Sequence, residues 1–216
     1  MIAVKDIFKS YGDLQVLKGV NLNVDSGETV SIVGASGAGK TTLLQIIGTL
    51  DKADSGRLSI NSTDLHTLND KDLSQFRNES IGFVFQFHNL LSEFTALENI
   101  CLPAFIKGTK RSDAESQAQE LLSILNLKDR AHHKPNVLSG GERQPVAVAR
   151  ALINKPSVLL ADEPSGNLDS KNADELHQIL LNLNKEMGQS CIIVTHNTSF
   201  ADMADRKLTM VDGLIV

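Results

Sequence analysis

The chain has 216 residues, 41% of them hydrophobic, which is typical of a domain with a sizeable core and excludes an intrinsically disordered chain. A formal net charge of −5, without any block of lysine or arginine, argues against a nucleic-acid partner. The two cysteines, Cys101 and Cys191, fit neither a metal site nor a disulfide framework, so we interpret them as reduced thiols of a cytosolic protein, and no apolar run is long enough to span a bilayer.

Alternating apolar residues open the chain and predict antiparallel strands, with a turn at Ser26-Gly27. The β-branched run that follows this turn predicts a short buried strand, and a glycine-rich loop then leads into a helix. The elements expected in this first part are strands over 2–8, 20–24, 29–33, 57–60 and 81–85 and helices over about 39–48 and 70–77.

Helical signals dominate the stretch from about residue 87 to about residue 155. Thr95 with Glu98, and Ser112 with Glu115, have the spacing of a capping box, which predicts that a helix begins at each pair. The apolar face of the second of these helices comprises Leu121, Leu122 and Leu125.

After this helical stretch the alternation of strand and helix resumes. The elements expected there are strands over 158–161, 191–195 and 207–211 and a helix over 171–187. This order predicts an α/β fold with a mainly parallel sheet, an antiparallel β N-terminal part and an inserted helical lobe at about 87–155, all within one domain over residues 1–216.

A glycine-rich segment after the strand over 29–33 matches the eight-position phosphate loop in full. It consists of Gly34, Ala35, Ser36, Gly37, Ala38, Gly39, Lys40 and Thr41. The glycines let successive backbone N–H groups face phosphate oxygens. Lys40 supplies a positive charge for the β- and γ-phosphates, and the Thr41 hydroxyl is placed to bind Mg²⁺. The segment therefore predicts a nucleoside-triphosphate site.

Two carboxylates end a later apolar strand and complete such a site. Asp162 is placed to hold Mg²⁺, and Glu163 to orient or deprotonate the attacking water. Three other residues give weaker signals when taken alone: Gln86 at a strand end, His196 after a strand, and Tyr11 near the N-terminus. A single histidine or tyrosine in such a place is more often structural than functional.

A Ser-Gly-Gly element in front of another predicted helix gives the chain a second candidate phosphate site. Ser139 is a predicted N-cap, and Glu142 completes its capping box. The amides of Gly140 and Gly141 would lie at the helix start, where the macrodipole favours an anion. Since one nucleotide has one γ-phosphate, the simplest interpretation is that two chains share each nucleotide.

With these motifs in this order, the sequence resembles the ATP-binding subunits of ABC transporters over essentially its whole length. The resemblance implies a P-loop NTPase core, ATP hydrolysis with ATP and Mg²⁺ as cofactors, and a head-to-tail homodimer. Long ATPases of chromosome structure and repair share this composite site, but no heptad array separates the two halves of this chain.

The resemblance also implies roles for individual residues. Tyr11 would stack on adenine, and the residues that would bind ATP are Gly34, Ala35, Ser36, Gly37, Ala38, Gly39, Lys40, Thr41 and Thr42. Mg²⁺ would be bound by Thr41, Gln86 and Asp162, and catalysis would be carried out by Glu163, His196 and Gln86. The signature motif, which meets the nucleotide of the other subunit, would comprise Ser139, Gly140, Gly141 and Glu142, and Asp169 would belong to the D-loop.

Within this family the sequence resembles the lipoprotein-releasing ATPases most, with macrolide-type exporter ATPases nearby. The runs that carry this resemblance are residues 82–91, 94–100 and 161–169. It implies a peripheral protein on the cytoplasmic side of the inner membrane that powers release of lipoproteins toward a periplasmic carrier. A macrolide-type exporter ATPase and a regulatory cell-division ATPase remain as alternatives, because both would keep every catalytic residue.

Five of the eight phenylalanines lie between residues 83 and 105. We expect Phe83 and Phe85, on a strand, to fill the core. The apolar residues of the loop-like segment after that strand are Phe87, Leu90, Leu91 and Phe94. An apolar loop in this place suits a groove that receives a short helix, so we expect integral membrane subunits to dock near residues 86–105.

Pro145 departs from the family pattern, which usually has arginine after Gln144. Inside a helix, proline lacks the N–H group and crowds the carbonyl of Gly141 four residues earlier, at a cost of about 3 kcal/mol. We therefore expect an irregular signature helix, and we expect the substitution Pro145→Arg to stabilise the chain.

Overall fold

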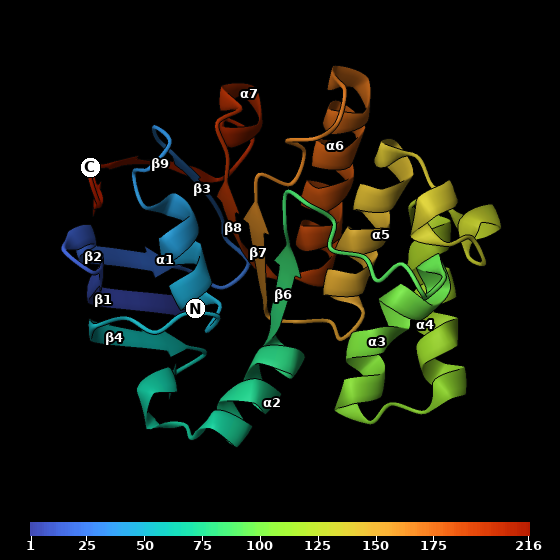
Figure 1. Cartoon of the computed structure of the whole chain (residues 1–216), viewed down its shortest axis with the longest axis horizontal. Helices are drawn as coiled ribbons and strands as arrows, with labels where there is room; N and C mark the ends of the chain where they lie inside the picture. The colour runs from blue at the N-terminus through green and yellow to red at the C-terminus, as the bar shows by residue number, and fades with distance from the viewer.

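The computed structural model describes residues 1–216, with ten strands and seven α-helices arranged as in Figure 1. The strands are β1 (Ile2–Tyr11), β2 (Leu14–Val24), β3 (Thr29–Val33), β4 (Ser55–Ile60), β5 (Thr63–Asp64), β6 (Ile81–Val84), β7 (Val158–Asp162), β8 (Ser190–Val194), β9 (Arg206–Val211) and β10 (Leu214–Ile215). The α-helices are α1 (Lys40–Ile47), α2 (Asp70–Ser80), α3 (Ala96–Lys107), α4 (Arg111–Ile124), α5 (Gly140–Leu152), α6 (Ser170–Met187) and α7 (Thr198–Ala201).

The strands form two sheets, an antiparallel one of order β2-β1-β4-β5 and a mainly parallel one of order β10-β9-β3-β8-β7-β6. In the antiparallel sheet β1 pairs with both β2 and β4, so that Ile2 lies opposite Val24 on one side and Ile60 on the other. All three side chains are fully buried, because the period of two places alternate residues of each strand on the core face. The predicted antiparallel start of the chain is confirmed.

Apolar layers cover both faces of the parallel sheet. Along β7, Leu159 and Ala161 belong to one buried cluster, whereas Val158 and Leu160 belong to the other. The first cluster includes residues of α3, α4, α5 and α6, and the second includes residues of α1 and of the antiparallel sheet. A parallel sheet that is buried on both faces requires continuous apolar strands, which explains the runs in β3, β7 and β8. The predicted α/β fold class is confirmed.

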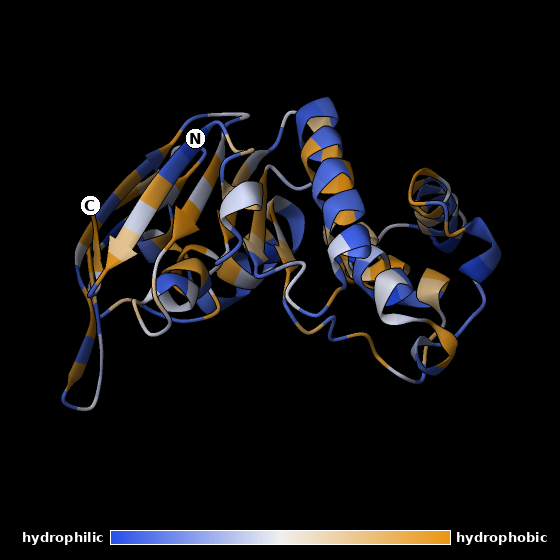
Figure 2. Cartoon of the chain, turned by 90° about the horizontal axis from the view of Figure 1, so that it is seen from above, coloured by the Kyte–Doolittle hydropathy of each residue, from blue (hydrophilic) through white to orange (hydrophobic).

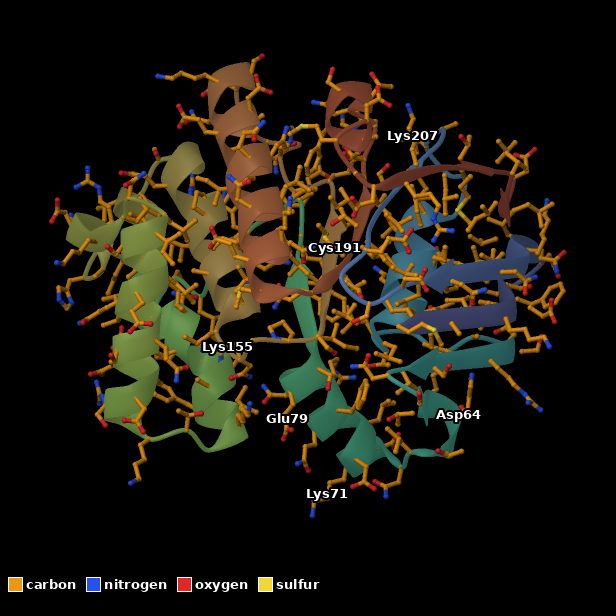
Figure 3. The ribbon with its side chains drawn as sticks, turned by 180° about the vertical axis from the view of Figure 1, so that it is seen from behind. Asp64, Lys71, Glu79, Lys155, Cys191 and Lys207 are labelled. Carbon is orange, nitrogen blue, oxygen red and sulfur yellow. The ribbon has the colours of Figure 1, made fainter.

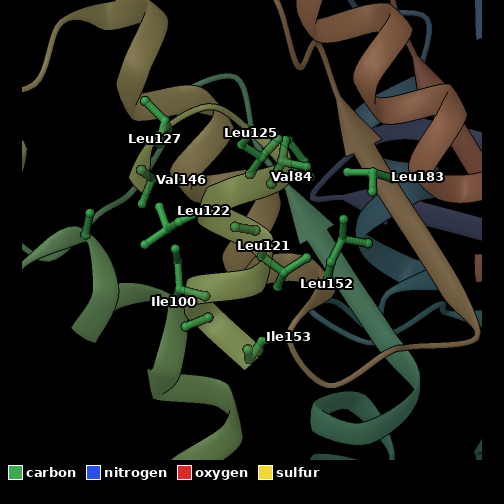
Figure 4. Packing of buried hydrophobic residues seen from close by; sticks show 14 of the residues in the cluster. Val84, Ile100, Leu121, Leu122, Leu125, Leu127, Val146, Leu152, Ile153 and Leu183 are labelled. Atoms are coloured by element: carbon green, nitrogen blue, oxygen red, sulfur yellow. The ribbon is translucent and has the colours of Figure 1, made fainter. Parts of the chain in front are cut away.

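Helices α3, α4 and α5 come between β6 and β7 in the chain and lie to one side of both sheets (Figures 1 and 2). Figure 4 shows their contact layer, where Leu122 of α4 lies near Ile100 of α3 and Val146 of α5, and Leu121 lies toward Leu152 of α5. The predicted apolar face of α4 is buried, with 9% or less of Leu121, Leu122 and Leu125 exposed. No helix of the chain combines the length and the apolar character that crossing a bilayer requires.

Figure 3 contrasts the buried middle of the parallel sheet with the charged periphery. Cys191 on β8 lies centrally, whereas charged side chains such as Lys71 and Lys207 lie at the edge of the molecule. Both cysteines are free and buried. Burial raises the pKa of Cys101 to about 11 and the pKa of Cys191 to about 12, so both thiols stay protonated near neutral pH.

The start of α4 differs from the prediction. The helix begins at Arg111 with Lys110 as N-cap residue, and no side chain caps it. Glu115 instead accepts a hydrogen bond from Arg111 one turn earlier, with 2.7 Å between Nε and Oε1. The predicted capping box at Ser112 is therefore wrong, because its acidic member has a better partner. The box at Thr95 is confirmed.

Other differences concern the ends of the chain's strands. β2 begins at Leu14, six residues before the predicted start, and β1 extends to Tyr11. β5 and β10 were not predicted, because two residues are too few to show a periodic pattern.

Helix α5 runs without interruption from Gly140 to Leu152, although Pro145 lies inside it. The expected irregularity does not interrupt the helix. Pro145 is buried, as are Val146 and Val148 on the following turn, so packing holds the segment helical despite the missing N–H group. The proline still leaves the carbonyl of Gly141 without its usual partner four residues on.

Because this position is buried, alanine tests the effect of the proline better than arginine does. We expect Pro145→Ala to raise the free energy of unfolding by about 1 kcal/mol, since the restored hydrogen bond and relieved clash outweigh the lost ring contacts. The denaturant midpoint of the full chain measures this change. A midpoint that falls would show that ring packing and the lower entropy of the unfolded chain count for more.

Candidate active site

A cavity of about 520 Å³ lies where the parallel strands β3, β6, β7 and β8 end. The carboxyl ends of parallel strands meet at one edge of a sheet, so residues far apart in the sequence converge there. Most of the predicted site residues line this cavity. They are Gly34, Ser36, Gly37, Gly39, Lys40, Thr41, Thr42, Gln86, Asp162, Glu163 and His196, together with Leu14, Val16 and Val194, which were not predicted.

Two glycines, Gly34 and Gly39, determine the shape of the phosphate loop. Gly39 caps α1 in the left-handed region at φ 102°, which favours glycine. A Cβ atom on Gly34 would lie 2.2 Å from the carbonyl oxygen of Met210 on β9. The Lys40 ammonium donates to the carbonyl oxygens of Gly34 and Ala35, each at 2.8 Å. Lys40 is therefore held over the loop that the glycines shape.

Thr41 and Asp162 bring together the oxygen ligands that a magnesium ion requires. The Thr41 hydroxyl donates to Asp162 Oδ1 at 3.2 Å, and Gln86 lines the same cavity. Burial raises the pKa of Asp162, an effect that the hydrogen bond from Thr41 opposes. A hydroxyl, a carboxylate and an amide oxygen are hard ligands suited to Mg²⁺, which also keeps several waters and binds the phosphates of its nucleotide. The donor set fits this ion.

Glu163 follows β7 in a strained conformation, with a φ of 46°. Its backbone N–H donates to the carbonyl oxygen of Val194 on β8 at 2.8 Å. Its carboxylate Oε2 lies 2.9 Å from His196 Nδ1 and accepts a hydrogen bond from the Thr195 hydroxyl at 3.2 Å. Such strain persists only where surrounding contacts determine the conformation, and it is common at active sites. Two neighbouring strand ends thus orient one carboxylate toward the cavity.

Side-chain amides from two other segments hold the backbone around Gln86. Asn167 donates to the carbonyl oxygen of Gln86 at 2.8 Å, and Gln144 of α5 donates to that of Phe85 at 2.9 Å. Arg150, also on α5, donates to the carbonyl oxygens of His88 and Asn89 at 2.7 and 2.6 Å. These contacts were not predicted, because polar side chains that bind distant backbone show no sequence pattern.

The Ser-Gly-Gly element lies outside the cavity. Ser139 and Glu142 form the predicted capping box at the start of α5, with Ser139 N donating to Glu142 Oε2 at 2.8 Å. The Arg130 guanidinium and the Ser139 bonds lower the pKa of Glu142 to about 2. A Cβ atom on Gly140 would meet nothing within 4 Å. The first turn of α5 is therefore open at Gly140, whereas a Cβ atom on Gly141 would lie 3.0 Å from the side chain of Asn172.

Asp169 and Tyr11 also lie apart from the cavity lining. Asp169 is the N-cap of α6 and accepts from Asn172 N at 3.1 Å. Tyr11, 49% exposed at the end of β1, donates its hydroxyl hydrogen to Asp51 and has the Lys9 ammonium 5.0 Å from its ring centroid. Its cross-strand neighbour Leu14 lines the cavity instead.

Comparison with known proteins places these features in a family context. Residues 17–166 match the ABC transporter family. The chain is 58% identical to the lipoprotein-releasing system ATP-binding protein LolD of Bacteroides fragilis (strain YCH46), with 100% of each chain covered. It is 46% identical to the LolD protein of Myxococcus xanthus (strain DK1622), over 99% of this chain and 97% of that protein.

Solved structures agree with this match. A dimeric structure of the ATP-binding cassette MJ0796 in a post-hydrolysis state, bound to ADP and Pi, has a TM-score of 0.92 and 42% sequence identity, covering 100% of this chain and 96% of that chain. Another dimeric structure of MJ0796, a bacterial ABC transporter cassette, has a TM-score of 0.92 and 43% identity over the same shares.

Proposed function

The chain belongs to the ABC transporter family of ATP-binding proteins, and from that membership we propose that two copies hydrolyse ATP in shared sites to power release of lipoproteins from the bacterial inner membrane toward a periplasmic carrier. The identity of 58% over the full length to a lipoprotein-releasing system ATP-binding protein supports this cargo class. The chain would act as a peripheral protein on the cytoplasmic side of that membrane.

One observation supports a site that is formed by two chains. The cavity with the phosphate loop and both carboxylates holds no residue of the Ser139–Gly141 turn, which opens outward with space around Gly140. A helix N-terminus with unpaired N–H groups favours an anion. A head-to-tail pair of chains would bring this turn of one copy onto the γ-phosphate held by the other, and the dimeric state of the similar cassettes supports that pairing.

Within each site the residues would have different roles. Lys40 and the loop amides bind the phosphates, and Thr41, Asp162 and Gln86 would hold Mg²⁺, which supplies charge neutralisation at the β- and γ-phosphates when bound. Glu163 would orient the attacking water and take its proton, because its carboxylate faces the cavity from a fixed backbone. His196, paired with Glu163 at 2.9 Å, would hold that carboxylate and contact the γ-phosphate.

An apolar groove between α3 and α4 suits the membrane partner. A cavity of about 200 Å³ is lined by the side chains of Phe94, Leu97, Glu98, Cys101, Leu102, Phe105, Arg111 and Glu115. The range predicted to dock also contains Phe87, 68% exposed, and ends next to Ile106, 75% exposed, and these two side chains line separate cavities. A short amphipathic helix of an integral membrane subunit would bury the apolar side chains of the groove. The membrane proteins that copurify with this chain from detergent extracts can be identified. Their identity distinguishes an ATPase of lipoprotein release from one of a macrolide exporter or a cell-division complex.

A shared site makes hydrolysis depend on protein concentration. We expect the turnover rate per chain to rise as the full chain is concentrated through the range in which it dimerises, because only the dimer completes the γ-phosphate shell. Turnover and size-exclusion mass, measured on the same dilution series with Mg-ATP, test this. A rate per chain that stays constant while the mass changes from dimer to monomer would contradict the shared site.

A further inference from the structure

His177 of α6 is a buried, titratable side chain that the site described above does not use. It is 2% exposed, and it lies between the two segments that follow β7 and β8. Its Nε2 atom lies 2.7 Å from the hydroxyl oxygen of Ser165. Its ring is stacked on Phe200 of α7, with 3.6 Å between ring centroids and 7° between ring planes. One imidazole therefore contacts both segments.

Each contacted residue is close in sequence to one member of the Glu163–His196 pair. Ser165 comes two residues after Glu163, in a turn closed by the hydrogen bond from Gly166 N to Glu163 O at 3.0 Å. Phe200 comes four residues after His196, and its N–H donates to the side chain of Asn197 at 3.0 Å. Displacement of either segment would therefore move one partner of the 2.9 Å contact between Glu163 and His196.

The surroundings of His177 favour a fixed connection between the segments that follow β7 and β8. Burial lowers its pKa, and the exposed Asp174 carboxylate, 3.9 Å from Nδ1, opposes this only in part. The ring is therefore neutral near neutral pH, with one nitrogen able to pair with the Ser165 hydroxyl and no buried charge to stabilise. A hydrogen bond and a ring stack in a buried place define position more narrowly than apolar packing alone.

We propose that His177 is a positioning residue for ATP hydrolysis, which holds the segments after β7 and β8 together so that Glu163 and His196 meet at the γ-phosphate. This role rests on the proposed function. Because His177 touches neither the phosphate loop nor the Mg²⁺ ligands, it sets the rate of the chemical step and leaves nucleotide affinity unchanged.

Three substitutions in the full chain separate its two contacts. His177→Phe keeps a ring against Phe200 and removes the hydrogen bond. His177→Gln places an amide nitrogen or oxygen at the same number of bonds from Cα as Nε2 and removes the stack. Ser165→Ala removes the same hydrogen bond from the other side with little change in volume. Gln178→Ala, the adjacent exposed position on α6, is the matched control.

Steady-state ATPase kinetics, measured at protein concentrations above the range in which the chain dimerises, test this role. We expect His177→Phe and Ser165→Ala to lower kcat about 10–100-fold, the order of effect that small misplacement of reacting groups produces. KM for ATP should change less than about twofold. His177→Gln should recover most of the lost rate, the double variant should be no slower than either single one, and Gln178→Ala should match the wild type.

Two results would overturn this role. One is a wild-type kcat in His177→Phe and Ser165→Ala. The other is a loss in kcat that matches the unfolded fraction seen by circular dichroism at the assay temperature and that glutamine does not recover, which would mark His177 as structural only. A wild-type chain without ATP turnover would instead overturn the proposed function itself.

Discussion

Replacement of Glu163 by glutamine is expected to lower ATP turnover about 10²–10⁴-fold, the usual contribution of a general base, while leaving nucleotide binding intact. Glutamine has nearly the same shape, so it fits the strained backbone at φ 46° and still accepts a hydrogen bond from Thr195. It lacks the charge that takes a proton from water. Lys40, Thr41 and Asp162 would still hold Mg-ATP, so the dimer should form on ATP and persist.

ATP turnover and size-exclusion mass with Mg-ATP measure both parts of this expectation. Glu175→Gln on the exposed side of α6 is a matched control, because it makes the same chemical change where Glu175 faces only Lys171 at 4.0 Å. Lys40→Ala should instead weaken nucleotide binding itself. Turnover at the wild-type rate in Glu163→Gln would exclude Glu163 as the base.

Mixing two inactive variants should restore hydrolysis if each site is built from two chains. Lys40→Ala removes the charge of the phosphate loop, and Gly140→Asp places a carboxylate where the partner's γ-phosphate would lie. The added side chain has open space in the free chain, and an acidic residue in the first turn of a helix is favourable. The folded chain should therefore tolerate Gly140→Asp, and each variant alone should turn over ATP at least about 10²-fold more slowly.

In a mixed dimer one site carries both defects and the other carries neither. Random pairing of equal amounts makes half of the dimers mixed, so the mixture should recover about a quarter of the wild-type rate. Lys40→Ala mixed with Glu163→Gln is the control, because both defects lie on the same side of the site and no pairing yields an intact one. A first mixture no faster than the average of its two components would show that each chain completes its own site.

Much of the fold and the cavity lining could be predicted from the sequence because their signals are local. The buried strand over Thr29–Val33 is observed with the predicted bounds, and the capping boxes at Thr95 and Ser139 form as expected. A phosphate loop needs glycines, a lysine and a threonine at fixed spacing, and that spacing places all of them on one strand-loop-helix turn. Periodicity, caps and loops of this kind involve residues within a few positions of one another, so the chain itself determines them.

The tertiary structure decided what depends on distant partners. Glu115 binds Arg111 rather than capping with Ser112, and α5 continues as a helix through Pro145 because Val146 and Val148 pack into the core. Contacts from Gln144 and Asn167 to the backbone near Gln86, and from His177 to Ser165, join segments that no sequence period relates. The separation of the Ser139 turn from the cavity also became visible only in the folded chain, because the tertiary arrangement fixes which motifs lie together and which lie apart.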